Sequence, residues 1–283
     1  MLPTEKTLLA FLTEMFEAGH SYSAINSARS AVSALAMDSN PPLGQATLIC
    51  KFLRGVFNIR PQLPRYSRTW DANIVLNYLK RLSPPKFISL KQLSYKTAML
   101  LSLLSGQRGQ TILSFNIDHM IINKTEISFQ INSLLKCSKP GRHSEPVIFR
   151  AYQEDPSLCV RVYVQAYLLR TKELRKDETQ LFISYQKPYK AISRDTLARW
   201  IRTTMQLAGI DTAIFKPHST RAASVSTAAK FLPTKSILKA VGWSQESTFY
   251  KYYKKSIQLQ NQESIQSGVL AGQASSATFA DDA

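Results

Sequence analysis

The sequence predicts a mainly α-helical protein with a small antiparallel β-sheet, arranged as two domains. Apolar residues recur at helical spacing through most of the 283 residues, and clear residue-by-residue alternation is confined to 126–135. A basic, proline-containing segment at 60–66 separates a short helical part from a longer one. A chain of this length is long enough for two domains that each bury a core.

The first domain is expected over residues 1–60 and contains three helices. Their apolar periodicity predicts helices at 4–18, 23–37 and 45–57, the first with Thr4 as its N-cap. Residues 61–68 are expected to form a linker, because Pro61 and Pro64 disfavour a helix.

The second domain is expected over 69–258. Helices are predicted at 71–82, 89–105, 157–172, 193–208, 218–230 and 233–241. The alternating segment at 126–135 predicts a strand, which a turn at 137–142 joins to a returning strand at 147–149, and 113–122 could add a third strand. Residues 259–283 are rich in Ser, Gln, Ala and Gly and are expected to be disordered.

The charge of the chain indicates a polyanionic partner. The formal net charge is +17, and because 259–283 contain three acids and no Lys or Arg, residues 1–258 carry +20. A folded body this basic attracts nucleic acid. The basic residues are spread along the chain, which disfavours binding to a membrane surface, and no apolar run is long enough to span a bilayer.

Other classes of site and compartment are disfavoured. The three cysteines lie far apart and form no CxxC pair, which argues against a disulfide framework or a zinc site. The N-terminus shows no basic region followed by an apolar core, so a cytosolic or nuclear location is expected.

Three short patterns carry groups that could perform chemistry. Each has an ordinary explanation when taken alone: a cation at a helix end, a polar helix start and aromatic core packing. The patterns are Arg108 just past an apolar helix, the pair His218 and Arg221 at a helix start, and Gly242-Trp243 followed by Tyr250, Tyr252 and Tyr253.

Two lysines, Lys136 and Lys139, lie on the predicted hairpin between Arg108 and His218. Taken in chain order together with these lysines, the three patterns resemble the catalytic signature of the tyrosine recombinases, the phage-integrase-like family. The segments 64–71, 215–224 and 242–249 look most like the recombinases of DIRS-type retrotransposons and Cryptons. The resemblance runs across residues 1–258 and is densest from 60 to 258.

The resemblance implies a two-domain architecture and a reaction. Residues 1–60 would be a helical, SAM-like core-binding domain, and 69–258 an α+β catalytic domain that clamps double-stranded DNA together with it. The enzyme would act as a tetramer on DNA in the recombination and integration of a mobile element, in the nucleus if the source is eukaryotic and otherwise in the cytoplasm. It would cut and rejoin strands through a 3′-phosphotyrosyl link, which conserves bond energy and requires neither ATP nor a metal cofactor.

The same resemblance assigns roles to individual residues. Arg108 and Arg221 would bind the non-bridging phosphate oxygens, since a guanidinium fork binds two oxygens and stays charged. His218 would bind the phosphate or accept the tyrosine proton, and the indole N–H of Trp243 would donate to a phosphate oxygen. Tyrosine has an ordinary pKa of about 10, so we expect the cationic pocket to favour its phenolate.

Two assignments stay open within the sequence. The lysine that protonates the leaving 5′-oxygen is Lys136 or Lys139, with Lys136 favoured by the subgroup pattern. The nucleophile is Tyr253, ten residues after Trp243, or Tyr252, nine residues after it, and the spacing from Phe249 favours Tyr253. Thr111 occupies a position where many relatives have an acid.

Two other functions fit the same pattern. The chain could be a catalytically inactive, transposon-derived DNA-binding protein, although no catalytic residue is clearly missing from it. It could also resemble a type IB topoisomerase, although the separate helical domain and linker fit that class less well.

Overall fold

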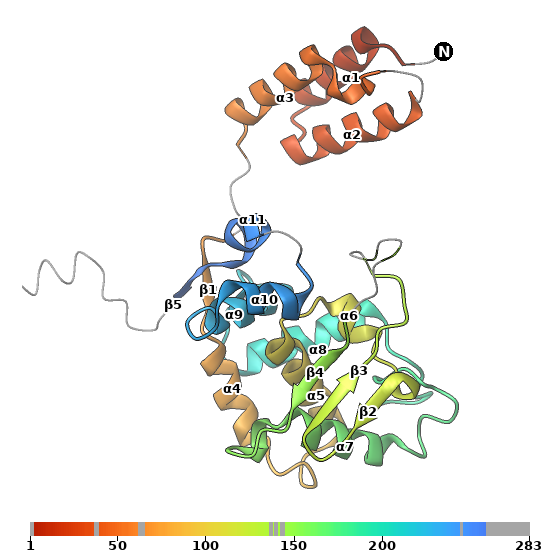
Figure 1. Cartoon of the computed structure of the whole chain (residues 1–283), viewed down its shortest axis with the longest axis vertical. Helices are drawn as coiled ribbons and strands as arrows, with labels where there is room; N and C mark the ends of the chain where they lie inside the picture. The colour runs from red at the N-terminus through yellow and green to blue at the C-terminus, as the bar shows by residue number, and fades with distance from the viewer. Residues whose placement is uncertain are drawn as a thin grey trace, which may run out of the picture. The chain divides into compact units, whose positions relative to one another are not determined.

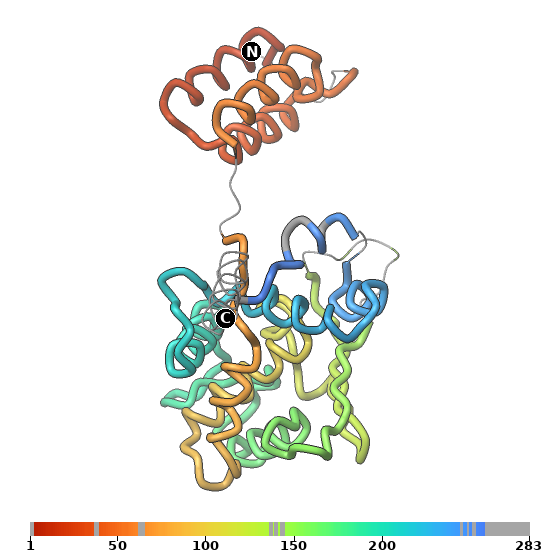
Figure 2. Tube along the Cα trace, turned by 90° about the vertical axis from the view of Figure 1, so that its left-hand side faces the viewer, coloured from red at the N-terminus to blue at the C-terminus, as the bar shows by residue number. Residues whose placement is uncertain are grey.

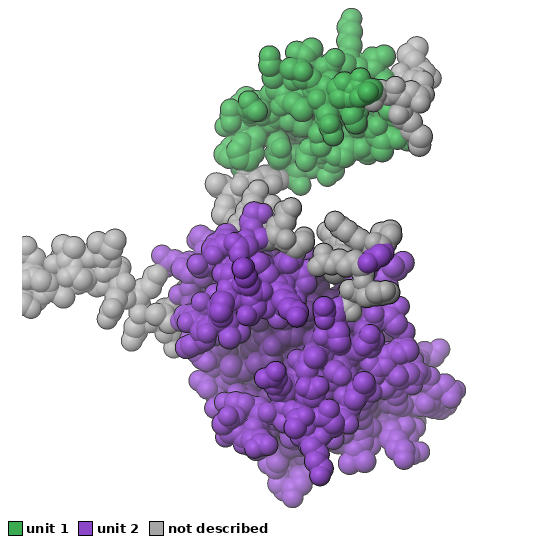
Figure 3. Space-filling model, viewed as in Figure 1, with its two compact units in different colours: residues 1–65 green, residues 66–283 purple. Residues whose placement is uncertain are grey.

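The computed structural model describes residues 3–36, 40–61, 66–135, 138, 141, 145–243 and 246–258. The chain divides into two compact units, residues 1–65 and 66–283 (Figure 3). Each unit has its own hydrophobic core within the described residues.

Unit 1 is helical. It contains α1 (Glu5–Glu17), α2 (Tyr22–Leu35), the short 3₁₀ helix η1 (Leu43–Gln45) and α3 (Thr47–Ile59). Thr4 caps α1 in a reciprocal capping box, as predicted. The end of α3 is tied to α1 by Arg60, whose Nη1 donates to the carbonyl of Phe16 at 2.7 Å. The core is formed by Leu8, Leu12, Ile25, Leu43, Ile49, Leu53 and Val56.

Unit 2 is built around α5 (Leu90–Ser105), whose residues 93–103 are all buried. This helix contacts α7 (Val160–Thr171), α8 (Arg194–Leu207) and α9 (Ser219–Ala228). Helix α4 (Ala72–Arg81), capped by Asp71, lies beside them, and α10 (Thr234–Val241) follows α9 (Figure 1). The buried Lys96 on α5 donates to the carbonyls of Leu79 and Leu82 at the end of α4.

Three strands form an antiparallel sheet in the order β2-β3-β4. They are β2 (Met120–Ile122), β3 (Glu126–Phe129) and β4 (Val147–Arg150), and the 3₁₀ helix η2 (Ile117–His119) precedes them. The strand predicted over 126–135 ends earlier, at Phe129. Phe129 pairs with Val147, the first residue of β4. The residues after Phe129 that continue the alternating pattern therefore have no pairing partner within β4.

A second sheet joins distant parts of the chain. Strand β1 (Arg68–Trp70) pairs in parallel with β5 (Ser256–Gln258), so that Thr69 lies opposite Ile257. The sequence analysis predicted neither strand, and Arg68 lies at the end of the expected linker. Figures 1 and 2 show that this pairing brings the segment after α10 back to the start of unit 2.

The predicted fold class, mainly α with a small antiparallel sheet, is confirmed. Besides β1, β5 and the 3₁₀ helices η1 and η2, four more short elements were not predicted, and all of these four but η3 lie after α10 or beside Arg108: α6 (Gly109–Leu113), η3 (Pro156–Leu158), α11 (Glu246–Thr248) and the π-helix η4 (Phe249–Tyr253). In the part of the chain that the structure describes, no helix combines the length and apolar character needed to cross a bilayer.

Candidate active site

Four segments of unit 2 bring the predicted site residues together. Arg108 is the N-cap residue of α6, and His218 directly precedes α9, which carries Arg221. Trp243 follows α10, and Tyr253 is the last residue of η4.

The loop that carries Arg108 lies where the end of α5 closely approaches α9 and α10. Gly106 ends α5 with φ +60°, and a Cβ at this position would lie 3.1 Å from side-chain atoms of Val225 and Val241. The left-handed backbone and the crowding both require glycine. The next residue, Gln107, donates from Nε2 to the carbonyl of Ala240 at 2.8 Å. The loop that carries Arg108 is therefore packed against α9 and α10.

Arg221 lies inside the site, with 2% of its surface exposed. Its Nη2 donates to the carbonyl of Val241 at 3.3 Å. The start of α9 is held in place by a buried hydrogen bond of 2.8 Å from the indole N–H of Trp70 to the hydroxyl of Ser219. Strand β1, which contains Trp70, thus fixes the helix that carries His218 and Arg221.

Arg221, Trp243 and Tyr253 form a compact cluster. The guanidinium carbon lies 4.5 Å from the centre of the Trp243 ring and 5.3 Å from that of Tyr253, and the two ring centres are 4.5 Å apart. Attraction between the cation and the ring faces stabilises this arrangement. The indole N–H of Trp243 is buried and has no hydrogen-bond partner among the described residues.

The Tyr253 hydroxyl points to His218. Its oxygen lies 3.4 Å from Nε2 of His218, and the two rings meet edge to face with centres 6.1 Å apart. If the imidazole proton is on Nδ1, Nε2 can accept the phenol proton. The contact therefore pairs a phenol hydroxyl with an imidazole nitrogen that can accept its proton.

The electrostatic environment of His218 is cationic. The pKa of His218 lies below its ordinary value, first because packing removes water from part of the ring and then because of the charges of Arg221, Arg108 and Arg194. A neutral imidazole at physiological pH follows from this shift. A group of arginines around it favours an anion such as a phosphodiester.

Sequence reasoning missed three residues of this region. Arg194, the first residue of α8, acts electrostatically on His218 but belongs to no pattern in the sequence. Gln107 could have been suspected only as a neighbour of Arg108. Ser226 on α9 bonds to the backbone on both sides of Lys254, a contact across 27 residues that no local signal predicts.

Several predicted residues are not placed by the described part of the chain. Lys136 and Lys139 lie outside the described residues, and the side chain of Tyr252 is not described either. Thr111 is buried within α6. Tyr250 is half exposed and packs against Phe249, with ring centres 5.2 Å apart.

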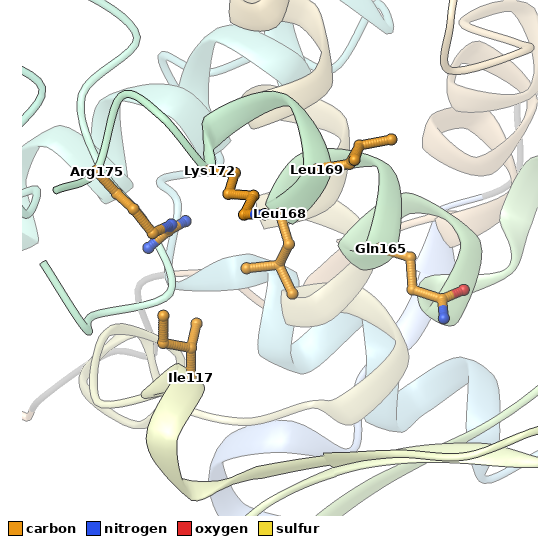
Figure 4. Close-up of a pocket in the computed structure, with 6 residues that line it drawn as sticks. All are labelled: Ile117, Gln165, Leu168, Leu169, Lys172 and Arg175. Atoms are coloured by element: carbon orange, nitrogen blue, oxygen red, sulfur yellow. The ribbon is translucent and has the colours of Figure 1, made fainter. Parts of the chain in front are cut away.

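A separate pocket of about 390 Å³ lies along α7 and contains none of the predicted site residues (Figure 4). Its lining is Ile117, Gln165, Leu168, Leu169, Lys172 and Arg175. Among the residues that the structure describes, no three His, Cys, Asp or Glu side chains are grouped so that they could hold a metal ion.

The arrangement is that of a helical protein in which arginines surround a tyrosine–histidine pair, a site suited to phosphoryl transfer. The model of the phage integrase family matches residues 77–258, well over half of the chain. The chain therefore belongs to the phage integrase family. No curated protein sequence matches it.

Solved structures of DNA-bound integrases and recombinases share the fold. The chain is similar to the XerH site-specific recombinase bound to a palindromic difH substrate, with a TM-score of 0.61 and 14% identity over 96% of this chain and 72% of that one. It is also similar to the Tn1549 transposon integrase in complex with transposon right-end DNA, with a TM-score of 0.60 and 12% identity over 96% and 85%. A lambda integrase dimer bound to a COC′ core site gives a TM-score of 0.54 and 16% identity over 93% and 67%.

Proposed function

We propose that this chain is an active tyrosine recombinase that cuts and rejoins strands of double-stranded DNA through a 3′-phosphotyrosyl intermediate. The observation that carries the proposal is the 3.4 Å contact between the Tyr253 hydroxyl and Nε2 of His218, in surroundings made cationic by Arg108, Arg194 and Arg221. Family membership supports the class of reaction, and this contact supports Tyr253 as the nucleophile and His218 as its base.

The first step is attack of the Tyr253 oxygen on a DNA phosphorus. The phenol proton passes to Nε2 of His218, which is neutral because its pKa is lowered. A bond forms between the phenolic oxygen and phosphorus, and the bond from phosphorus to the 5′-oxygen breaks. The reverse reaction, with a 5′-hydroxyl from another strand, releases Tyr253 and completes the exchange without loss of the phosphodiester's bond energy.

Arg108 and Arg221 stabilise the charge that develops on the non-bridging oxygens. Each guanidinium can donate two parallel hydrogen bonds, and loss of one such donor costs about 10²–10³ in rate. Trp243 contributes a third donor. Its indole N–H is buried without an acceptor among the described residues, and a phosphate oxygen would provide one.

The leaving 5′-oxygen takes its proton from a lysine on the segment between β3 and β4. The assignment is Lys136, with Lys139 as the alternative, and it rests on the pattern in the sequence. After Lys136 donates its proton, the neutral amine can recover one from water or accept one from the 5′-hydroxyl that attacks in the second step.

The biological setting is the integration and recombination of a mobile element, by analogy with DIRS-type retrotransposons and Cryptons. The segments 64–71, 215–224 and 242–249 support this subgroup. A tetramer on DNA fits it, as does a nuclear location in a eukaryotic host. The lambda integrase tetramer bound to a Holliday junction, which has the same fold, is a precedent for such an assembly.

The test is covalent trapping on nicked DNA. A pool of labelled duplexes with a randomised core carries a nick beside each candidate cleavage position, so that the short 5′-hydroxyl strand diffuses away after attack. Wild-type protein should then give a labelled protein–DNA band that survives denaturation. Sequencing the trapped strands identifies the target.

Substitutions separate the candidate nucleophiles. Tyr253→Phe should abolish the covalent band while DNA retention on a native gel persists, and Tyr252→Phe should leave the band. A band lost only in Tyr252→Phe would overturn the assignment of Tyr253. DNA binding with no band in wild type would favour an inactive DNA-binding protein, and trapping without joining of two duplexes would favour a topoisomerase-like activity.

A further inference from the structure

Ser226 fastens the backbone on both sides of Lys254 to α9. Its hydroxyl donates to the carbonyl of Tyr253 at 2.8 Å and accepts from the amide of Lys255 at 3.0 Å. The residue is 6% exposed, so water competes little for these bonds. One hydroxyl thus binds the carbonyl of the proposed nucleophile itself and the amide two residues further on.

This geometry differs from that of three serines on α5. Ser94, Ser102 and Ser105 on α5 each donate to the carbonyl four residues earlier in their own helix. A serine inside a helix commonly makes this local hydrogen bond. The Ser226 hydroxyl instead reaches a segment 27 residues away in the sequence.

The carbonyl of Tyr253 requires such a partner. It is the last residue of η4, and the last carbonyls of a helix have no amide within the helix to bond to. Inside this short helix the amide of Lys254 bonds to the carbonyl of Phe249, five residues earlier, in the pattern of a π-helix. Ser226 satisfies the terminal carbonyl in place of water.

The bonds also set where the tyrosine lies relative to its partners. The same helix carries Arg221, and His218 directly precedes it, so Ser226 ties Tyr253 to the scaffold of its base and its cation. Other described contacts of this backbone segment include packing by the buried Phe249, the pairing of β5 with β1, and a 3.4 Å contact between the hydroxyls of Tyr250 and Thr234. Packing is non-directional, and the pairing of β5 with β1 begins only at Ser256, so the two hydrogen bonds of Ser226 act directly on the backbone of Tyr253 and Lys255.

We infer that Ser226 is a positioning residue for strand cleavage, which holds the backbone of Tyr253 so that its hydroxyl stays at His218 and Arg221. The inference rests on the proposed function, because it takes Tyr253 as the nucleophile. A displacement of about 1 Å in a reacting group can cost about 10² in rate.

The experiment compares three full-length variants with wild type. Ser226→Ala removes the hydroxyl, and Ser226→Thr keeps it. Thr227→Val is the matched control, because Thr227 lies on the same helix with a buried hydroxyl that has no hydrogen-bond partner among the described residues. Each protein is tested for its thermal unfolding midpoint, its DNA affinity and its single-turnover rate of covalent trapping at saturating protein.

Ser226→Ala should lower the trapping rate about 10- to 100-fold while DNA affinity changes less than about twofold. Ser226→Thr should recover most of the rate, and Thr227→Val should match wild type. A rate in Ser226→Ala within about twofold of wild type would overturn the inference, as would an equal loss in Thr227→Val. Hydrogen exchange at the Lys255 amide should rise in Ser226→Ala alone.

The two proposals fail in different ways. If wild type traps no DNA, the proposed function fails, and exchange at Lys255 still decides whether Ser226 holds this backbone. If wild type traps DNA through Tyr253 and Ser226→Ala is as fast, the inference fails while the proposed function stands.

Discussion

Replacement of Gly106 by alanine tests whether the close approach of α5 to α9 and α10 builds the site. Gly106 has φ +60°, and a Cβ there would lie 3.1 Å from Ser224 Oγ and from methyl carbons of Val225 and Val241. Gly209 offers a matched control, since it also has a positive φ, +91°, but a Cβ there meets nothing within 4 Å.

The expected destabilisation has two parts. A left-handed backbone costs a residue with a Cβ about 1–2 kcal/mol, and both variants share this cost. Carbon contacts are optimal at about 3.5–4.0 Å, so three neighbours at 3.1 Å must move apart, and overpacking of this kind costs about 1–3 kcal/mol. Gly106→Ala should therefore lower the free energy of unfolding by about 2–5 kcal/mol, and Gly209→Ala by about 1–2 kcal/mol.

Urea unfolding followed by tryptophan fluorescence measures both free energies. Trapping on nicked DNA, measured where both variants are folded, should also slow for Gly106→Ala, because the shifted loop carries Arg108 away from Arg221. Equal losses of stability in the two glycine variants, with trapping unchanged, would show that the close approach does not position Arg108.

Three further predictions concern charged and titrating groups. If neutral His218 accepts the phenol proton, the trapping rate should stay flat from pH 8 down to about 6.5 and fall only at lower pH, and His218→Asn should remove this fall along with most of the rate. Arg221→Lys should slow trapping about 10²-fold with little loss of DNA retention, since lysine lacks the fork that binds two oxygens. Burial lowers the pKa of Lys96 to about 7, so the folded state binds fewer protons than the unfolded state between pH 7 and 10.5. The free energy of unfolding should then rise with pH in that window by up to about 1.4 kcal/mol per unit, and Lys96→Met, compared by urea unfolding at pH 7.5 and 9.5, should remove the rise.

The helices could be predicted because their apolar spacing and caps are local signals. Thr4 and Asp71 cap the helices that follow them, and Gly106 ends α5 where the periodicity stops. The two-stranded sheet could not be predicted. Ser256–Gln258 contains a single apolar residue, and it forms a strand only because β1 lies beside it, 188 positions away in register.

The site was predictable as a set of residue types but not as a geometry. The order of Arg108, His218, Arg221 and Trp243 carries the family signature, yet nothing in it shows that Arg221 is buried against the Trp243 ring. The count from Phe249 favoured Tyr253, and the structure places the Tyr253 hydroxyl beside His218. The choice between Lys136 and Lys139 stays a prediction, because both lie outside the described residues.

The end of α10 explains how the separate segments of the site are held together. Its last four carbonyls have no amide within the helix, and each accepts a hydrogen bond from a residue beyond the helix end or from another segment. Two of the donors belong to the turn that Gly242 makes with φ +71°, and the other two come from the loop of Arg108 and from α9. The pairs are Leu238 with the Trp243 amide, Lys239 with the Gly242 amide, Ala240 with Gln107 Nε2, and Val241 with Arg221 Nη2.

This helix end carries a partial negative charge, which offsets part of the cost of burying the Arg221 guanidinium. The same turn places the Trp243 ring over that guanidinium, so the charge is held by a carbonyl and by a ring face. Neither contact removes the positive charge as a carboxylate partner would, and Arg221 still acts as a cation on His218. A helix end that orients a buried arginine without neutralising it is suited to binding a phosphodiester, because the anion then meets a charge that is already in place.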